Sequence, residues 1–292
     1  MRSNPVEYHE FWQFRANRIR CYRNKVRLRG LNKFWGKLTG IPTSLTSVTQ
    51  SVAELLSAVH KISNQNMASW IILNGALLIA AYFLGSIPTG YALGKWMLGI
   101  DIREVGSGST GATNVLRTLG KWPGLGVLLV DVLKGVCAIV LIRYIYAIDF
   151  TQQLATTAGL DNTANMMPWM ATLAGLFAVL GHSKSIWLGF TGGKSVATSL
   201  GVLLGLYWPA GLGTLGIFGI VFAVSRIVSL SSIMGAISVA GLMFALHQPL
   251  AYVLFGIAGG VFVIVRHRSN IQRLLNGTEP RIGEKLETAA SD

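Results

Sequence analysis

The sequence predicts an all-α protein that crosses a membrane several times. Of its 292 residues, 51% are hydrophobic and only 13% are charged, which is far from the composition of a soluble domain. The hydrophobic residues are gathered in blocks, several of them long enough to cross the hydrocarbon core of a bilayer. Short polar segments separate the blocks. We therefore interpret the chain as a polytopic integral membrane protein of about seven transmembrane helices, with polar loops on the cytoplasmic side forming the site.

The spans can be placed along the chain by hydropathy and charge. In the first block, 69–93, the residues around Pro88 are small and a kink is expected. The block 196–224 is interrupted at Trp208-Pro209. Splitting that block at Pro209 keeps all the basic polar segments on one side of the membrane, as the positive-inside rule requires. The remaining predicted spans are 124–148, 168–181, 229–246 and 249–265.

Much of the formal charge of +13 lies before residue 67. Residues 1–66 are compatible with a basic arm for membranes or nucleic acid, with a transit-type leader, or with a segment absent from the mature protein. In the predicted topology a basic leader would lie on the outer side of the membrane. This favours the interpretation that residues 1–66 are absent from the mature protein. We expect 1–66 to be disordered or not part of the mature protein, with 10–38 a basic amphipathic helix and 41–65 a linker. The working domain is 67–283, followed by a polar tail, 284–292. No ordered nucleic-acid-binding module is visible, and no nucleic-acid partner is predicted.

The polar segment 101–120 has the composition of a phosphate site. Glycines at 106, 108 and 111 alternate with hydroxyl and amide side chains, and Arg103 and Arg117 flank them. Glycines let backbone N–H groups approach an anion, and guanidinium groups match phosphate oxygens. The alternative is a flexible connector.

Two further polar segments repeat this chemistry. Gly192-Gly193-Lys194-Ser195 offers amides, an ammonium and a hydroxyl, although its glycine spacing is not that of a Walker A loop. Near the C-terminus, His267 and Asn270 are three residues apart and can point at one site. That basic segment, 266–283, is equally compatible with an ordinary positive-inside tail.

Asp131 and Lys134 lie on one face of a predicted span. Charges inside a span are costly and need partners or a watery cavity, so the pair is either a structural lock or part of the site. Cys21 and Cys137 form no disulfide or metal pattern, and no metal-ligand cluster is apparent, so neither metal nor cofactor is predicted.

Several ordered motifs resemble the bacterial acyl-phosphate:glycerol-3-phosphate acyltransferase family, PlsY. They are GSIPTGYALGK (85–95), DIREVGSGSTGATNVLRTLG (101–120), VDVLKG, GHSKSIWLGFTGGKSVATSLGVL and RHRSNIQRLLNGTE. The resemblance implies a seven-helix enzyme of the bacterial inner membrane, with its site facing the cytoplasm. Such an enzyme transfers a fatty acyl group from acyl phosphate to the 1-hydroxyl of glycerol 3-phosphate. The products are lysophosphatidic acid and phosphate, in the first step of phospholipid synthesis. The implied partners are glycerol 3-phosphate, acyl phosphate and membrane lipids, and the oligomeric state stays open.

The resemblance also implies roles for individual residues. Those expected to be catalytic are Ser107, Lys194, His267 and Asn270. Those expected to bind substrate are Arg103, Thr113, Asn114, Arg117, Gly192, Gly193 and Ser232. Glu279 is expected to be structural, and we assign Asp131 and Lys134 the same role. The sequence departs from the family at Ser109, at Ser195, where the family often has Gly, and in the residues after His182. No specific role is therefore expected for His182.

A transporter for a phosphorylated metabolite is the competing function. It would explain the basic loops and the intramembrane charges equally well. A transporter of this kind is expected to carry an internal repeat with broken helices near the midplane. No convincing repeat is visible, and the candidate ligands gather on one membrane face, so we favour the enzyme.

Overall fold

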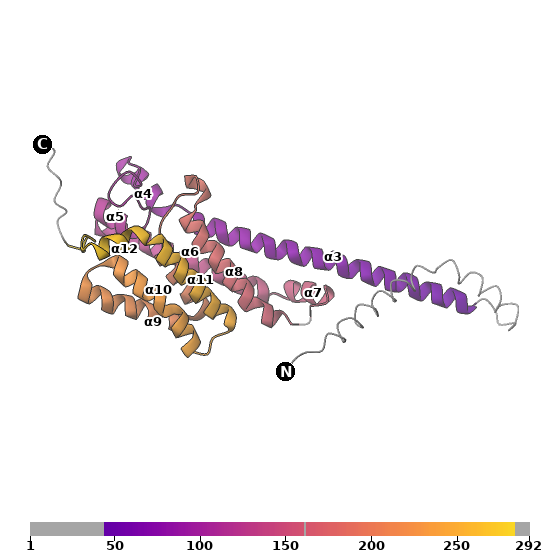
Figure 1. Cartoon of the computed structure of the whole chain (residues 1–292). Helices are drawn as coiled ribbons and strands as arrows, with labels where there is room; N and C mark the ends of the chain where they lie inside the picture. Colours follow the sequence, from indigo (N-terminus) through magenta and orange to yellow (C-terminus); the bar gives the residue numbers. More distant parts are fainter. Residues whose placement is uncertain (1–43, 161, 284–292) are drawn as a thin grey trace. The chain divides into compact units, whose positions relative to one another are not determined.

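The structure is a computed structural model that describes residues 44–160 and 162–283 (Figure 1). Contacts divide the chain into two units, 1–62 and 63–292. The described residues form helices joined by short segments, with no β-strand among them. The elements are α3 (Ser44–Ser86), α4 (Thr89–Leu98), α5 (Ala112–Leu119), α6 (Lys121–Ala147), α7 (Asp149–Thr157), α8 (Thr163–Ser183), η1 (Ile186–Leu188), α9 (Val196–Ser225), α10 (Val228–Ala245), α11 (Leu250–Arg266) and α12 (Arg268–Leu275).

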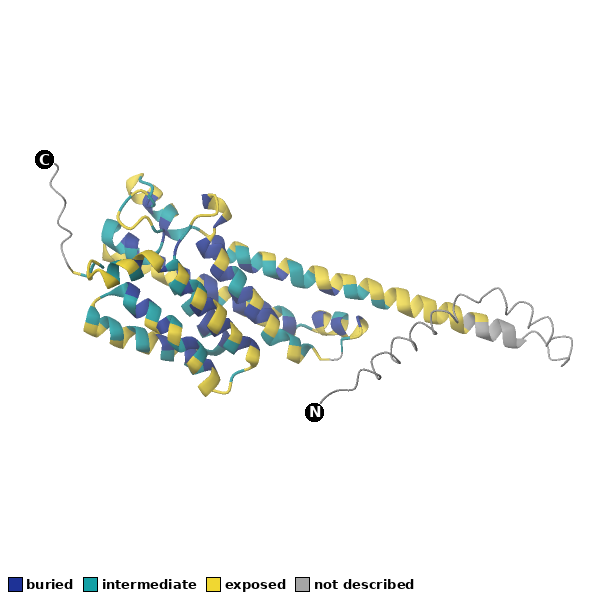
Figure 2. Ribbon diagram, in the orientation of Figure 1, coloured by how far each residue is buried: buried dark blue, intermediate teal, exposed yellow. Residues whose placement is uncertain are grey.

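The helix α3 corrects one sequence prediction. Residues 44–65 were expected to be a linker, yet α3 is helical from Ser44 onward. The chain contains neither Gly nor Pro between Pro42 and Gly75, so nothing interrupts a helix there. Apolar residues also recur at helical spacing, at 52, 55, 56, 59 and 62, although all of them are exposed (Figure 2). The Ser and Thr content was therefore misleading. The predictions for 1–43 and 284–292 lie outside the described residues.

The kink predicted within the first block, around Pro88, is confirmed. The helix α3 ends at Ser86 and α4 begins at Thr89, with Pro88 between them. The small residues on α3 bring α8 close, because a Cβ on Gly85 would overlap the backbone of Ala178. Conversely, a Cβ on Gly181 would overlap the carbonyl of Tyr82. These are the close backbone approaches that small residues permit between membrane helices.

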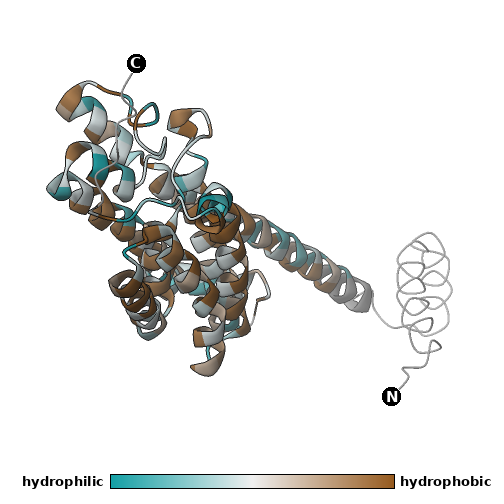
Figure 3. Ribbon diagram, turned by 60° about the vertical axis from the view of Figure 1, so that its left-hand side comes forward, coloured by the Kyte–Doolittle hydropathy of each residue, from teal (hydrophilic) through white to brown (hydrophobic). Residues whose placement is uncertain are grey.

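The core lies where α6, α8, α9, α10 and α11 meet. Its fully buried side chains include Ile139, Val202, Leu206 and Phe255. Glycines again set the helix spacing, since a Cβ on Gly201 would overlap the carbonyl of Val132. Hydrophobic residues predominate along these helices in Figure 3.

The interruption predicted in the block 196–224 is also confirmed. Helical geometry breaks at Tyr207, with φ −157° and ψ 99°. A Cβ on Gly211 would lie 3.0 Å from the backbone nitrogen of Leu204, so the chain after the break folds back on the chain before it. The break frees the carbonyl of Leu206, which accepts a hydrogen bond of 2.6 Å from Arg143.

The other predicted spans correspond to α6, α8, α10 and α11. The helix α8 begins at Thr163, five residues before the predicted start at 168. By length and hydropathy, five helices in the described part could cross a membrane, or six if the bent pair α11 and α12 is one span. The count of seven stays a prediction.

Candidate active site

A cavity of 680 Å³ lies among α5, α6, α9, α10, α11 and α12. One end is polar and charged, and the other is lined almost entirely by aliphatic and aromatic side chains. The polar end includes Ser107, Thr113, Asn114, Arg117, Lys194, Ser232, His267, Asn270, Arg273 and Glu279. The fold thus collects most of the predicted site residues from all three polar segments.

Lys194 is the centre of the polar end. Its Nζ donates a hydrogen bond of 2.5 Å to Oδ1 of Asn270, and Nδ2 of Asn270 donates one of 2.6 Å to Glu279. Burial, together with the nearby charges of Arg273, Arg117 and Arg266, lowers the pKa of Lys194 to about 8, and Glu279 opposes this shift. An ammonium held this way is poorly hydrated and is therefore ready to bind an anion.

Glu279 holds this cluster together. Its carboxylate accepts hydrogen bonds from Asn270, from Ser229 at 2.7 Å and from Arg273 at 2.7 Å. Burial alone would raise the pKa of Glu279, but these three hydrogen bonds hold it below the ordinary value. Ser229 and Arg273 were not among the predicted site residues. Because Ser229 belongs to a different helix, α10, no local spacing in the sequence links it to Glu279.

His267 faces the cavity at the junction of α11 and α12. Its Nδ1 lies 2.8 Å from the carbonyl oxygen of Val263. A carbonyl only accepts, so Nδ1 carries the proton and Nε2 of the neutral ring is left as an acceptor. His267 is 3% exposed, so little water competes for that acceptor.

Gly192 and Gly193 form a glycine loop that positions Lys194 and does not itself line the cavity. Gly192 and Gly193 are not among the lining residues. The N–H of Gly193 donates to the carbonyl of His182 at 3.3 Å, and both glycine carbonyls accept from Arg266, at 3.2 and 3.1 Å. A Cβ on Gly193 would overlap Nε2 of His182. His182, which was expected to have no specific role, is thus the support on which this loop lies.

Ser195 ends the loop in a backbone conformation that favours glycine. Its φ is 63°, in the left-handed region, at the position where the resembled family often has Gly. The hydroxyl of Ser195 donates a hydrogen bond of 2.8 Å to the carbonyl of Val179 and is buried. This hydrogen bond offsets part of the strain, so the side chain is tolerated.

The first polar segment is organised by Asn114. Its Nδ2 donates to the carbonyls of Ile102, Val105 and Ser109, at 2.9, 3.0 and 2.9 Å, and its Oδ1 accepts from the N–H of Ser107 at 2.8 Å. Asn114 is 1% exposed and its amide is fully used. It therefore shapes the loop, while Ser107, Thr113 and Arg117 line the cavity. Ser232 also lines the cavity, and its hydroxyl donates to Val228 within α10.

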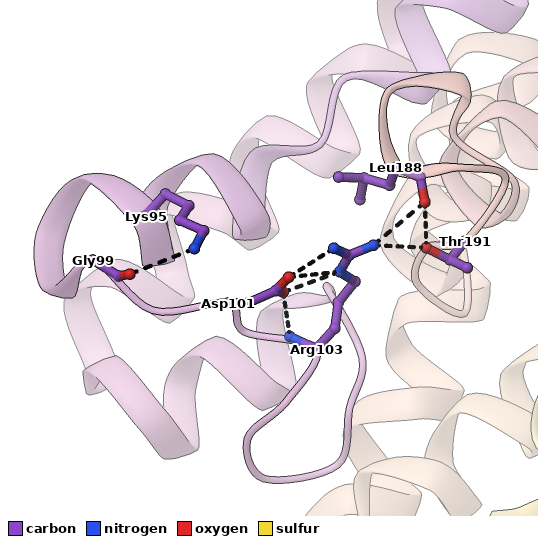
Figure 4. Close-up of polar contacts among 6 residues, drawn as sticks. All are labelled: Lys95, Gly99, Asp101, Arg103, Leu188 and Thr191. Carbon is purple, nitrogen blue, oxygen red and sulfur yellow. Dashed lines mark hydrogen bonds and ion pairs between the residues drawn. The ribbon is translucent and has the colours of Figure 1, made fainter.

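Arg103 does not line the cavity. Its guanidinium pairs with Asp101 at 2.7 Å and donates to the carbonyl of Leu188 and the hydroxyl of Thr191, at 3.3 and 3.2 Å (Figure 4). Hydrogen bonds from the side chain and backbone of Arg103 lower the pKa of Asp101 to about 2, so the pair stays ionised. Arg103 thus joins the first polar segment to the loop that carries Lys194.

Replacing Arg103 by Ala tests whether it joins the loops or binds substrate. We expect kcat to fall by about tenfold, because the loop that carries Lys194 loses a fixed support, while KM for the phosphorylated substrate that the resemblance implies changes little. The matched variant Arg117→Ala, which removes a cavity-lining guanidinium, should raise that KM instead. Equal increases in KM for both variants would show that Arg103 contacts substrate directly.

Asp131 and Lys134 form a buried ion pair of 2.8 Å within α6. Lys134 also donates to the carbonyl of Ile87 at 3.0 Å, in the kink between α3 and α4. Nδ1 of His182 lies 3.7 Å from Asp131. The pair therefore connects α6 to the kink and to the residue beneath the glycine loop, and Asp131 also lines the cavity.

The fold and the cavity together define a helical membrane protein in which cationic and polar side chains lie at one end of an apolar pocket. A sequence model described as glycerol-3-phosphate acyltransferase matches residues 75–277. The glycerol-3-phosphate acyltransferase of Trichormus variabilis is 63% identical over 222 residues, covering 76% of this chain and 97% of that protein. That of Trichodesmium erythraeum is 59% identical with the same coverage.

Two solved structures are similar to this chain. Both are of PlsY, an integral membrane glycerol 3-phosphate acyltransferase, one in its glycerol 3-phosphate form and one in its lysophosphatidic acid form. The first has a TM-score of 0.62 and 38% identity, covering 72% of this chain and 96% of the other. The second has a TM-score of 0.59 and 36% identity, covering 72% and 95%. The chain belongs to the glycerol-3-phosphate acyltransferase family.

Proposed function

We propose that this protein transfers a fatty acyl group from acyl phosphate to the 1-hydroxyl of glycerol 3-phosphate, giving lysophosphatidic acid and phosphate. The observation that carries this proposal is the cavity itself, in which a cationic end continues into an apolar end. A substrate that fits both has a phosphate group and an acyl chain. The two similar solved structures hold glycerol 3-phosphate and lysophosphatidic acid, which supports these substrates.

The polar end supplies charge for two phosphate groups. Lys194, Arg117 and Arg273 line it, and Arg266 lies behind the glycine loop. Two phosphates close together repel each other, and cations that are already fixed in place offset that repulsion without reorganising. Lys194 and Asn270 hold the acceptor, and Ser107 and Thr113 line the same cavity.

The reaction needs little acid–base help from the protein. The 1-hydroxyl oxygen forms a bond to the acyl carbon, and the bond from that carbon to the phosphate oxygen breaks. Phosphate is a good leaving group, and one of its oxygens takes the proton of the hydroxyl. Nε2 of His267 accepts a hydrogen bond from the hydroxyl. This interaction positions the hydroxyl and does not remove its proton.

The donor is tested by supplying purified protein with glycerol 3-phosphate and either palmitoyl phosphate or palmitoyl-CoA. We expect lysophosphatidic acid only with palmitoyl phosphate. Activity restricted to palmitoyl-CoA would keep the acyltransferase and refute the proposed donor. Absence of product with both, from well-folded protein, would favour transport of a phosphorylated metabolite.

The site is proposed to face the cytoplasm from the bacterial inner membrane. Basic residues gather at the end of the bundle that holds the site, including Arg117, Lys194 and Arg273. The connection from α6 to α8, residues 148–162, contains no Lys or Arg. Cytoplasmic segments of membrane proteins are enriched in these residues.

Activity should decline at alkaline pH because of Lys194. Its pKa of about 8 means that the free enzyme loses the ammonium proton as the pH rises through that value. Only the charged form attracts phosphate, so kcat/KM for glycerol 3-phosphate should fall by about tenfold per pH unit above it. The variant Lys194→Arg keeps its charge and, at whatever activity it retains, should show no such decline. A profile flat to pH 10 in the unmodified protein would contradict this role.

A further inference from the structure

The apolar part of the cavity is lined by α6, α9, α10 and α11. Leu203, Val239 and Phe255 are among its lining residues. All three are less than 10% exposed, so the cavity ends against the packed core. The packed core at this point limits the length of a chain that enters from the polar end.

The depth can be measured along α11. His267 and Phe255 are twelve residues apart (267 − 255), which at about 1.5 Å per residue makes roughly 18 Å. An extended chain advances about 3.3–3.6 Å for every three bonds, so this depth takes roughly fifteen bonds. That is the length of a palmitoyl chain.

Two glycines in the wall leave space that a side chain would fill. The nearest atoms to a Cβ on Gly259 would be those of the Phe255 ring, at 3.6 Å or more. The nearest to a Cβ on Gly235 would belong to Thr214 and Phe218, at 3.5 Å or more. These are ordinary van der Waals contacts. Both glycines line the cavity, and Gly259 lies eight residues from His267, or roughly 12 Å.

Helix packing explains two neighbouring glycines, Gly256 and Gly260. A Cβ on Gly256 would come within 2.9 Å of the backbone of Ala240, and one on Gly260 within 2.8 Å of the carbonyl of Ala236. Both therefore keep α10 and α11 in contact. Helix packing does not explain the missing side chains at Gly235 and Gly259.

We propose that Gly235 and Gly259 set the acyl-chain length that the enzyme accepts, by leaving room for the distal half of a long chain. This inference rests on the proposed function. It adds a determinant of chain length to that reaction. A larger side chain at Gly259 would fill the cavity roughly 12 Å from the site, leaving room for about ten bonds, and one at Gly235 would narrow it from α10.

The test compares octanoyl, dodecanoyl and palmitoyl phosphate as donors for the unmodified protein and for Gly259→Leu. We expect kcat/KM for palmitoyl phosphate to fall at least about tenfold, because methylenes that cannot be buried lose their binding energy. The value for octanoyl phosphate should stay within about threefold. Leucine favours helix over glycine, so the substitution should not weaken α11 itself.

Gly235→Val tests the same proposal from α10, and it should give the same shift toward short chains. The matched control is Gly241→Leu, also in α10, where a Cβ has no neighbour within 4 Å and no cavity is lined. Its chain-length profile should match that of the unmodified protein. An unchanged profile in both Gly259→Leu and Gly235→Val would overturn the proposal, as would an equal loss with all three donors. Inactivity of the unmodified protein with every acyl phosphate would instead refute the proposed donor.

Discussion

Replacing Lys194 by Ala is expected to lower kcat/KM by a hundredfold or more, or about 3 kcal/mol of transition-state stabilisation. Lys194 is the buried ammonium at the polar end, and it is linked through Asn270 to Glu279. Without it, two phosphate groups would meet in a pocket that has lost its central charge. The measurement is lysophosphatidic acid formation under steady-state conditions.

The matched control for Lys194→Ala is Lys184→Ala, an exposed lysine in the same loop. Its kcat/KM should stay within about threefold of the original value, because an exposed, solvated charge contributes little. A kcat/KM for Lys194→Ala within about threefold of the original value would refute the role given to Lys194.

The second large effect is expected on stability. Asp131→Asn leaves the ammonium of Lys134 buried without its carboxylate, which should cost about 3–5 kcal/mol of the free energy of unfolding. The double variant Asp131→Asn/Lys134→Met removes the stranded charge and should recover most of that loss. Thermal unfolding in detergent micelles measures both.

This pair of variants also separates a structural lock from a catalytic role. If the ion pair is structural, the double variant should be both stable and active. A stable but inactive double variant would place Asp131 in the chemistry, since Asp131 also borders the cavity. The exposed Lys95→Met serves as the control and should change stability by less than about 0.5 kcal/mol.

The helices and their breaks were largely predictable from the sequence, because hydropathy and proline act locally. The kink at Pro88 and the break next to Pro209 are examples. The helix before residue 66 was missed because Ser and Thr are tolerated in a helix that contains no Gly or Pro. Seven spans were expected because the positive-inside rule places the basic loops on one side of the membrane. That placement depends on the membrane as well as on the chain.

The site was predictable by residue type but not by role. Arg103 and Asn114 belong to a segment with phosphate-binding composition, yet both have their donors occupied by protein groups. Composition cannot distinguish a donor that faces the cavity from one that faces another loop. His182 and Ser229 were missed for a related reason, since their partners lie on distant elements and only the folded chain brings them together.

In the proposed reaction, the polar end of the cavity couples acyl transfer to phosphate release. The most direct measurement follows both products at once, from purified protein in lipid nanodiscs given palmitoyl phosphate with and without glycerol 3-phosphate. We expect lysophosphatidic acid and phosphate to appear in equal amounts, and phosphate release to stop when glycerol 3-phosphate is omitted. Phosphate released at the same rate without the acceptor would contradict the claim, because it would mean that water, not a bound glycerol hydroxyl, attacks the acyl carbon.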